Sequence, residues 1–541
     1  MTPSTVLRTF SRAAVVLACI NVAVISVLGG YDLGMAGLVA HSLFKPLQYL
    51  NGAVLLAMLA ARKGAAPVSR KAPLSRKAPF ASEAWFALAL LLLTFAIYWP
   101  SLPLNFEHRE WTHIWVSEQY TSLRGLASLL ATPQPDGFYR PLGFLSLWVD
   151  HLLFGQHFAG YHLQSLMLHA LNAFLAYRCF RALGFSEWCS QWAALLFCAA
   201  AVCFEPLVWP AARFDLLAVA FLLSALLAAI EYMSGRASKR ALAVLALCFA
   251  ASLASKETAF ALPVFAGVVW LARDFKLRNT RRLVHVELAA AALIAASLAV
   301  RISIYGGLGG YGWNEGTSPH FAVTLKTAAS LLTRAFATPQ FTINSAAGLP
   351  VWMRVAVILF AAGAAISAWS VRGQSRSRQL GVLGLIVASA LPVVNIIGWI
   401  GPSAAGSRYL YLPAIWMFLF LASAVEHSRA STVALSLLLA ANCAGALHHI
   451  HVLRATLAQV DASVATIRSA ALASPGSEVQ VIGLAPRGPV NGWIFAGEEI
   501  IERAQRSLPG TRITVHPLPP ADIPPGAVTL YWDKDRAALH R

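Results

Sequence analysis

The sequence predicts an all-α polytopic membrane protein with a small α/β tail. Of its 541 residues, 58% are hydrophobic and only 12% are charged, which is too apolar for a water-soluble globule. Apolar runs of roughly 17–25 residues, the length at which a helix crosses a bilayer, recur up to about residue 450. Beyond that residue the chain has ordinary polarity. A helical membrane core followed by a small polar domain is therefore expected.

About thirteen apolar runs predict about thirteen transmembrane helices, several of them short or interrupted. No convincing small-x-small cleavage site follows the first run, so we interpret it as a retained helix and not as a signal peptide. The runs lie near residues 13–29, 41–61, 81–100, 161–177, 189–207, 214–232, 241–254, 258–272, 283–304, 351–370, 380–400, 409–425 and 431–450.

Basic residues indicate the orientation of these helices. The net charge is +18, and four short basic loops fall on the same side of the predicted spans. Short basic loops mark the cytoplasmic side, so the N-terminus is predicted to be cytoplasmic and the C-terminus to lie outside. The same loops suit anionic membrane lipids, and their placement argues against nucleic-acid binding. Their basic residues are Arg62, Lys63, Arg70, Lys71, Arg76, Lys77, Arg236, Lys239, Arg240, Arg273, Lys276, Arg278, Arg281, Arg282, Arg372, Arg376 and Arg378.

The chain divides into three predicted regions. Residues 1–79 hold two N-terminal transmembrane helices and a basic cytoplasmic linker, residues 80–450 form the membrane core, and residues 451–541 form a small outer, periplasmic domain. The seven cysteines lie in or beside apolar spans, which indicates helix packing and no disulfide framework. In the tail, the predicted strands are Val479–Leu484, Arg512–Val515 and Ala527–Trp532, and the predicted helix is Glu498–Arg506.

The first predicted outer loop gathers acids and imidazoles next to the membrane. It carries Glu107, His108, Arg109, Glu110 and His113. A carboxylate placed there can act as a general base on an acceptor hydroxyl. Carboxylates with imidazoles can also hold a divalent cation, although no recognised ligand spacing occurs and no metal site is assigned. A solvated helix start with local ion pairs explains the same residues without any chemistry.

Three cations recur at the outer ends of later spans: Arg213, Lys256 and Arg408. Cations at one membrane level can converge on a phosphate group. Each one alone is equally well explained by a pair with a nearby acid, as Arg213 with Asp215 or Glu205. Their recurrence on the predicted outer side favours a binding site.

Aromatic and amide or imidazole side chains accompany these cations. Tyr139 and Arg140 precede a span, where they suit a phosphate or a sugar face, or simply an interfacial belt with a snorkelling arginine. Tyr409 lies beside Arg408. His169 shares one helical face with two other polar residues, a pattern that joins helices more often than it binds ligands.

Four separated blocks of this sequence resemble a known family. They read YRPLGFLSLWVDHLLFGQHFAGYHLQSLMLHALNAFLAY, EPLVWPAARFDLLA, SLASKETAFALP and LPVVNIIGWIGPSAAGSRYLYLPA. In order and topology they are similar to the membrane core of GT-C-fold glycosyltransferases. The nearest groups are the protein O-mannosyltransferases and the transmembrane O-mannosyltransferases that carry tetratricopeptide repeats. The resemblance covers roughly residues 82–425, and the repeats have no counterpart here.

The resemblance implies a GT-C-type fold whose first loop lies on the outer face of a bacterial inner membrane. It implies a hexosyl- or mannosyl-type transferase that takes a sugar from a polyprenyl-phosphate carrier and inverts the anomeric carbon. The acceptor is a protein, a lipid or a glycan. No cofactor is assigned beyond a possible divalent cation.

The resemblance also implies roles for single residues. The family's first outer loop usually carries an acidic pair, one member of which is the base. Here the stretch reads FEHREWTHI, so one acid is replaced, and the base is Glu107 or Glu110, with His108 beside it. The resemblance implies that Arg213, Lys256 and Arg408 bind the donor phosphate. The residues that it places in contact with the substrate are His108, Tyr139, Arg140, His169, Asp215, Glu257 and Tyr409.

Two other classes of function compete with this one. The altered acidic pair is compatible with a degenerate relative that binds lipid-linked glycan, or scaffolds envelope assembly, without catalysis. A transporter is disfavoured, because no inverted repeat and no pair of broken mid-membrane helices is evident.

Overall fold

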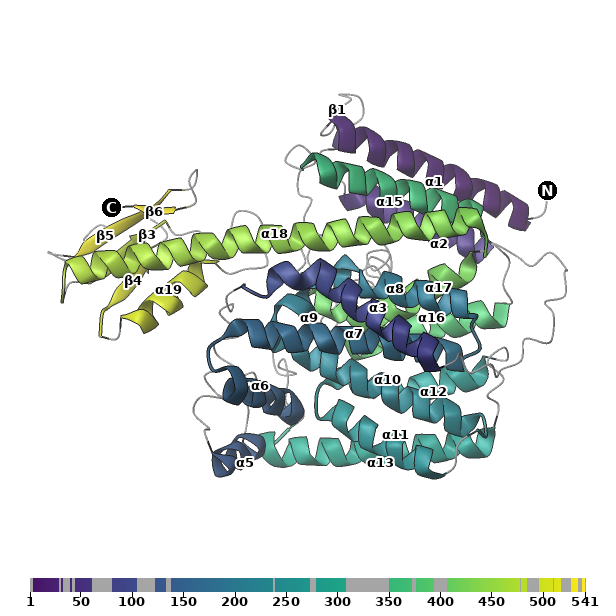
Figure 1. Cartoon of the computed structure of the whole chain (residues 1–541). Coiled ribbons are helices and arrows are strands. Elements are labelled where there is room, and N and C mark those ends of the chain that lie inside the picture. Colours follow the sequence, from purple (N-terminus) through teal and green to yellow (C-terminus); the bar gives the residue numbers. More distant parts are fainter. Residues whose placement is uncertain are drawn as a thin grey trace.

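The structure is a computed structural model, and it describes residues 3–28, 31–32, 39–40, 44–60, 80–104, 122–132, 138–236, 239–272, 279–307, 350–371, 376–393, 406–425, 427–476, 478–483, 496–508, 510–516, 527–533 and 538–540. Within these ranges the chain forms a bundle of helices with a small sheet beyond one end of it (Figure 1). The N-terminus lies at the other end of the bundle.

The core of the bundle surrounds α10 and α17, whose side chains are buried on nearly all sides. A helix that is apolar all round is stable only in such surroundings. By contrast, α3 and α13 expose large apolar side chains, among them Trp85 and Leu288, as helices in contact with lipid do. The core helices are α3 (Phe80–Tyr98), α6 (Pro141–Phe154), α7 (Phe158–Ala182), α8 (Glu187–Cys198), α9 (Phe204–Val208), α10 (Arg213–Met233), α11 (Lys239–Leu253), α12 (Ala261–Leu271), α13 (Thr280–Tyr305), α16 (Arg376–Ala390) and α17 (Tyr411–Ala424).

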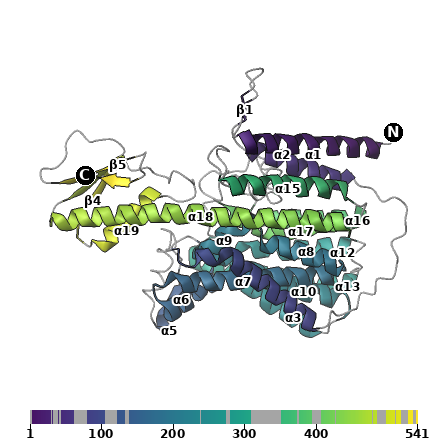
Figure 2. The ribbon, with the colours of Figure 1, turned by 45° about the horizontal axis from the view of Figure 1, so that its top comes forward.

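A second group of helices stands beside this core. It consists of α1 (Pro3–Leu28), α2 (Phe44–Ala60) and α15 (Val351–Trp369), and the short hairpin of β1 (Tyr31–Asp32) and β2 (Val39–Ala40) follows α1. The long helix α18 (Arg429–Ala473) runs between this group and the core (Figure 2). At Gly363 of α15 an added Cβ would lie 2.8 Å from the Ala434 carbonyl oxygen, so the two helices cross closely there.

The C-terminal sheet packs on the far half of α18. Its strand order is β4-β3-β5-β6, with β3 parallel to β4 and β5, and β6 antiparallel to β5. The three strands and the helix predicted in the tail are confirmed, and β6 was not predicted. Their bounds are β3 (Val479–Ile482), α19 (Ala496–Ser507), β4 (Ile513–His516), β5 (Val528–Asp533) and β6 (Ala538–His540).

The predicted class, a helical multi-pass membrane protein, is confirmed. Each of the apolar runs overlaps one of the helices given above. Among the described residues, six helices are long and apolar enough to cross a membrane, or seven if Glu187–Cys198 and Ala201–Val208 count as one span bent by 49°. The others, such as α11 and α12, are shorter apolar helices, so the number thirteen stays a prediction.

Two features differ in detail from the sequence expectation. The predicted outer segment before the fourth span contains α6 and also α5 (Leu123–Ala131). The expected boundary between residues 450 and 451 falls inside α18, because that helix continues without a break to Ala473.

Candidate functional site

The candidate site lies where several helices of the core are interrupted at the same end of the bundle. Between α8 and α10 the chain forms η2 (Ala201–Cys203), α9 and η3 (Pro210–Ala212), because Pro206 and Pro210 prevent one continuous helix. A second break, η4 (Glu257–Phe260), separates α11 from α12, and η9 (Ser407–Leu410) precedes α17. The breaks bring charged side chains from different helices together.

Arg213 joins three helices through a fully buried ion pair. Its guanidinium contacts the carboxylate of Asp150 on α6, and both side chains have no exposed surface. Its Nη2 also donates to the Tyr161 carbonyl of α7 at 2.7 Å. A buried charge of this kind is stable only when it is paired and hydrogen-bonded. Arg213, the first residue of α10, therefore fixes α6 and α7 at the start of that helix.

Lys256 is held in the break between α11 and η4. Its backbone is extended (φ −165°, ψ 158°), and its Nζ donates to Asp215 Oδ2 at 2.5 Å. Burial lowers the pKa of Lys256 to about 8; Asp215 opposes this shift, and Arg140 and Arg408 add to it. The same Nζ lies 5.4 Å from the centre of the Tyr409 ring.

Arg408 precedes Tyr409 on η9 and is the second cation that contacts the Tyr409 ring. Gly406, with φ +79°, turns the chain into η9, a conformation that other residues rarely adopt. Arg408 then pairs with the Glu205 carboxylate through its guanidinium and donates its backbone N–H to Glu205 Oε2 at 2.8 Å. Its guanidinium carbon lies 4.8 Å from the Trp209 ring centre and 4.6 Å from that of Tyr409.

Glu257 is shared by two arginines. Arg140 donates to its Oε2 at 2.8 Å, and Arg301 of α13 donates to its Oε1 at 2.8 Å. Arg301 Nη2 also donates to the Tyr139 carbonyl at 3.2 Å. Arg140 precedes Pro141, which disfavours helical backbone at that position, and its guanidinium carbon lies 4.0 Å from the centre of the Phe138 ring.

These contacts form one cluster that we call the ion-pair network. It contains most of the cationic and acidic site residues that the sequence predicted. In the structure these residues form ion pairs between cations and carboxylates. The expected pair of Arg213 with Asp215 or Glu205 is wrong, because Asp215 pairs with Lys256, Glu205 with Arg408, and Arg213 with Asp150. Asp150, Glu205 and Arg301 were not assigned to the site from the sequence. Asp150 and Arg301 each lie within an apolar stretch, and an ionisable residue there is a signal that could have found them. The network consists of Arg140, Asp150, Glu205, Arg213, Asp215, Lys256, Glu257, Arg301 and Arg408.

His169 lies apart from the network, inside the bundle. Its Nδ1 is 2.8 Å from the Tyr411 hydroxyl, and its Nε2 is 3.0 Å from the Cys198 carbonyl. Asn172 donates to the same Tyr411 hydroxyl at 3.1 Å and to the Leu216 carbonyl at 3.0 Å. This is the helix-joining arrangement that the spacing of these residues also predicted, and Tyr411 is the partner that the sequence did not reveal.

The predicted catalytic loop lies outside the described residues. This applies to Glu107, His108 and Glu110 alike. Within the part of the chain that the structure describes, no three His, Cys, Asp or Glu side chains are placed to hold a metal ion. The geometry therefore bears on the phosphate side of the predicted site and leaves the choice of base as a prediction.

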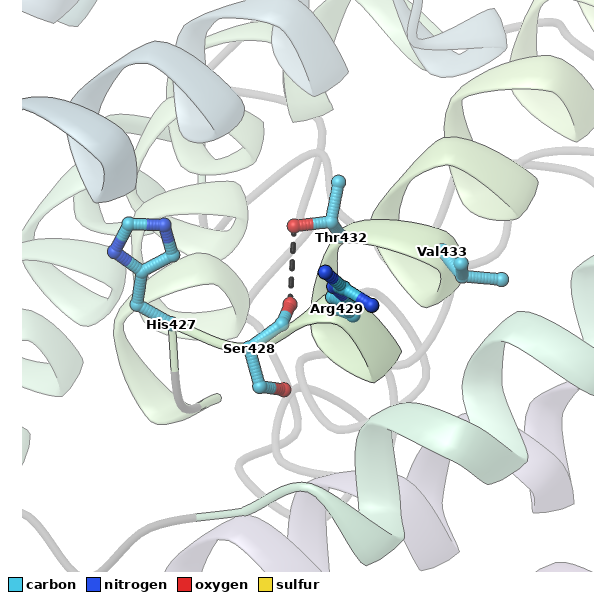
Figure 3. Close-up of a pocket in the computed structure, with 5 residues that line it drawn as sticks. All are labelled: His427, Ser428, Arg429, Thr432 and Val433. Atoms are coloured by element: carbon cyan, nitrogen blue, oxygen red, sulfur yellow. Dashed lines mark hydrogen bonds between the residues drawn. The ribbon is translucent and has the colours of Figure 1, made fainter.

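A pocket also opens at the start of α18, at the opposite end of the bundle from the network (Figures 1 and 3). Ser428 caps this helix by accepting a hydrogen bond from the Ser431 backbone N–H at 3.2 Å, and its carbonyl accepts one from the Thr432 hydroxyl at 3.0 Å. Among the described residues that line it, His427 supplies an imidazole and none supplies a carboxylate. Its lining residues are His427, Ser428, Arg429, Thr432 and Val433.

Comparisons with known proteins give remote structural matches. No protein-family model matches the chain, and no curated protein matches it. Among solved structures it is similar to the apo oligosaccharyltransferase of Archaeoglobus fulgidus, with 12% identity over 81% of this chain and a TM-score of 0.41. It is also similar to ArnT from Cupriavidus metallidurans bound to undecaprenyl phosphate, with 13% identity, 81% of this chain and 90% of that chain covered, and a TM-score of 0.33.

A third match is the Archaeoglobus fulgidus AglB in complex with an inhibitory peptide and a dolichol-phosphate, with 14% identity over 78% of this chain and a TM-score of 0.37. The chain spans 64% of the length of both archaeal structures. These proteins fall in the class that the sequence resembles, the GT-C-fold glycosyltransferases. Because the identities and scores are this low, no residue role, substrate or activity is carried from them to this chain.

Proposed function

We propose that this protein is a GT-C-type membrane glycosyltransferase. It takes a sugar from a polyprenyl-phosphate carrier and transfers it to a protein, lipid or glycan acceptor at the outer face of a bacterial inner membrane. The observation that carries the proposal is the ion-pair network, in which Lys256 and Arg408 both lie against the Tyr409 ring. The four sequence blocks that resemble the family supply the charged residues of this network, apart from Arg301.

In the proposed site, Lys256 and Arg408 bind the phosphate of the donor. Both keep some exposed side-chain surface, 7% and 14%, whereas Arg213 has none and supports them through α10. Asp215 and Glu205 hold the two cations in place before the donor arrives. Preorganised cations of this kind stabilise the negative charge that develops on a leaving phosphate.

The proposed reaction combines these two cations with the base predicted in the first outer loop. An acceptor hydroxyl oxygen attacks the anomeric carbon while the bond from that carbon to the phosphate oxygen breaks, and its electron pair stays on the phosphate. Glu107 or Glu110 takes the hydroxyl proton. Arg140, which belongs to the network, and its neighbour Tyr139 shape the cleft for the sugar and the acceptor. Attack opposite the leaving group inverts the anomeric carbon.

The test uses the purified full-length protein with a labelled polyprenyl-phosphate sugar. We expect K256A and R408A to weaken donor binding by at least about tenfold, since each removes a phosphate contact that carries charge. The double variant E107Q/E110Q should bind the donor and transfer no sugar. R178A is the matched control, because it breaks the ion pair with Glu83, which is 3.2 Å long and lies outside the network.

Two outcomes contradict the proposal in different ways. Unchanged donor binding in both K256A and R408A rules out the phosphate site. Donor binding without any transfer by the unaltered protein favours the degenerate glycan-binding relative, whose support is the replaced acid in FEHREWTHI.

A further inference from the structure

His169 and Asn172 are buried polar residues of α7, about one helical turn apart. Neither side chain has any exposed surface. The helix α7 packs against both α10 and α17, which begin directly after η3 and η9. A buried polar group is costly unless partners satisfy it, so the partners of these two residues indicate what the pair does.

The amide of Asn172 links the start of α10 to the start of α17. Its Nδ2 donates to the Leu216 carbonyl at 3.0 Å and to the Tyr411 hydroxyl at 3.1 Å. Leu216 lies in the first turn of α10, next to Asp215, and Tyr411 is the first residue of α17. Because a carbonyl oxygen can only accept, the amide nitrogen must face it, and this fixes the orientation of Asn172.

His169 holds the same Tyr411 hydroxyl from α7. Its Nε2 lies 3.0 Å from the Cys198 carbonyl, which can only accept, so this nitrogen carries a proton. In the neutral imidazole Nδ1 is then an acceptor, and the Tyr411 hydroxyl donates to it over 2.8 Å. The hydrogen bonds therefore run in one direction, from Asn172 through Tyr411 and His169 to the last residue of α8.

This chain of hydrogen bonds connects the two halves of the proposed phosphate site. The first half is Lys256, whose Nζ donates at 2.5 Å to Asp215 in the first turn of α10. The second half is Arg408, on η9 immediately before α17. The two cations come from separate breaks in the helices, and both lie against the Tyr409 ring. The Asn172 amide thus joins the support of one cation to the element that carries the other.

We propose that Asn172 is a positioning residue that sets the spacing of Lys256 and Arg408 for the phosphate of the sugar donor, with His169 and Tyr411 as its support. The inference rests on the proposed function, because these are the two cations of that site. The three supporting side chains are buried inside the bundle and act through the starts of α10 and α17. Two cations can bind one phosphate together only when their separation matches its oxygens.

An amide that only joins helices makes a different prediction, and Gln379 provides the comparison. It lies in α16, is buried, and donates to the Met58 carbonyl of α2 at 3.2 Å. The helix α2 carries no residue of the ion-pair network. Q379L should therefore lower the stability of the protein and leave its affinity for the sugar donor unchanged, whereas N172L should lower both.

The experiment measures binding of a labelled polyprenyl-phosphate sugar to the full-length protein in four forms: unaltered, N172L, R408A and N172L/R408A. We expect N172L alone to weaken binding about fivefold, the size of one hydrogen bond. Without Arg408 the spacing of the cations no longer matters, so N172L should add less than about twofold to the effect of R408A. Y411F, which removes one oxygen atom and keeps the ring, should reproduce part of the fivefold loss.

The outcomes separate this inference from the proposed function. If N172L binds the sugar donor as tightly as the unaltered protein, or weakens binding equally with and without Arg408, the positioning role is wrong and the proposed function stands. The same conclusion follows if Q379L weakens binding as much as N172L does. If N172L does not fold, Y411F replaces it in the same comparison with R408A. If the unaltered protein binds no sugar donor, the proposed function fails and this inference fails with it.

Discussion

At the scale of single residues, Lys256 is the phosphate-side cation whose charge changes within an accessible pH range. Burial lowers its pKa to about 8, whereas the arginines around it stay charged at any pH in use. Below pH 8 the ammonium is present, and above pH 8 it is lost. We expect donor affinity to fall as the pH rises through about 8, measured with a sugar phosphodiester whose own charge is constant.

The control for this pH dependence is K256R. An arginine at this position stays charged, so its affinity should remain flat to beyond pH 9. The same pKa has a consequence for stability. Between about pH 8 and 10.5 the unfolded chain binds a proton that the folded chain does not, so the free energy of unfolding should rise with pH in that range. A pH profile of K256R identical to that of the unaltered protein would remove Lys256 from the explanation.

The pair of Arg213 and Asp150 leads to a prediction about stability. D150N leaves a fully buried guanidinium without its carboxylate, which should lower the free energy of unfolding by about 3–5 kcal/mol. D150N/R213Q removes both charges and should recover much of that loss. Denaturant unfolding in mixed micelles measures both variants, and equal losses in the two would show that the charge of the pair is not what matters.

The sequence could indicate these residues, but it could not assign their partners. Arg213, Lys256 and Arg408 stand out because charges are costly near a membrane, and a nearby acid was a foreseeable partner. Which acid each one meets depends on how α6, α9, α10 and η4 pack, and that is a tertiary property. Arg301 shows the limit most clearly, since its partner Glu257 lies 44 positions earlier in the chain.

At the scale of helices, the crossing of α15 and α18 can be tested with one methyl group. G363A places a Cβ 2.8 Å from the Ala434 carbonyl oxygen, which is backbone and cannot turn away. We expect a loss of about 1–3 kcal/mol in the free energy of unfolding. Gly267 in α12 is the matched control, because nothing lies within 4 Å of its added Cβ. G267A should be neutral or slightly stabilising, and similar effects of the two changes would contradict this account.

Hydropathy predicted the helices better than it predicted their ends. A run of apolar residues shows that a helix must be buried in lipid or protein, so every predicted run coincides with a helix. The same signal missed α6, whose 14 residues are too few to span a bilayer. It also stopped α18 near residue 450, because the helix there leaves apolar surroundings and continues on the strength of its contacts with α19 and β6.

At the scale of the whole molecule, the fold predicts which surfaces share a side of the membrane. The ion-pair network and the C-terminal sheet lie toward one end of the bundle, and the N-terminus lies toward the other (Figures 1 and 2). We expect S507C, on the exposed surface of α19, to react with a membrane-impermeant thiol reagent in intact cells. R236C, three residues after the end of α10 and on the predicted cytoplasmic side, should react only after permeabilisation. Labelling of both in intact cells would overturn the proposed orientation.

The uninterrupted length of α18 has a mechanical consequence. Its 45 residues rise by about 1.5 Å each, so the helix is roughly 67 Å long, more than twice the apolar thickness of a bilayer. One end of the helix packs in the bundle, and the sheet packs on the other end. The number of residues between them therefore fixes the orientation of the sheet about the helix axis. One inserted residue would rotate the sheet by about 100°, and seven would restore nearly the original orientation, about 10 Å farther from the bundle.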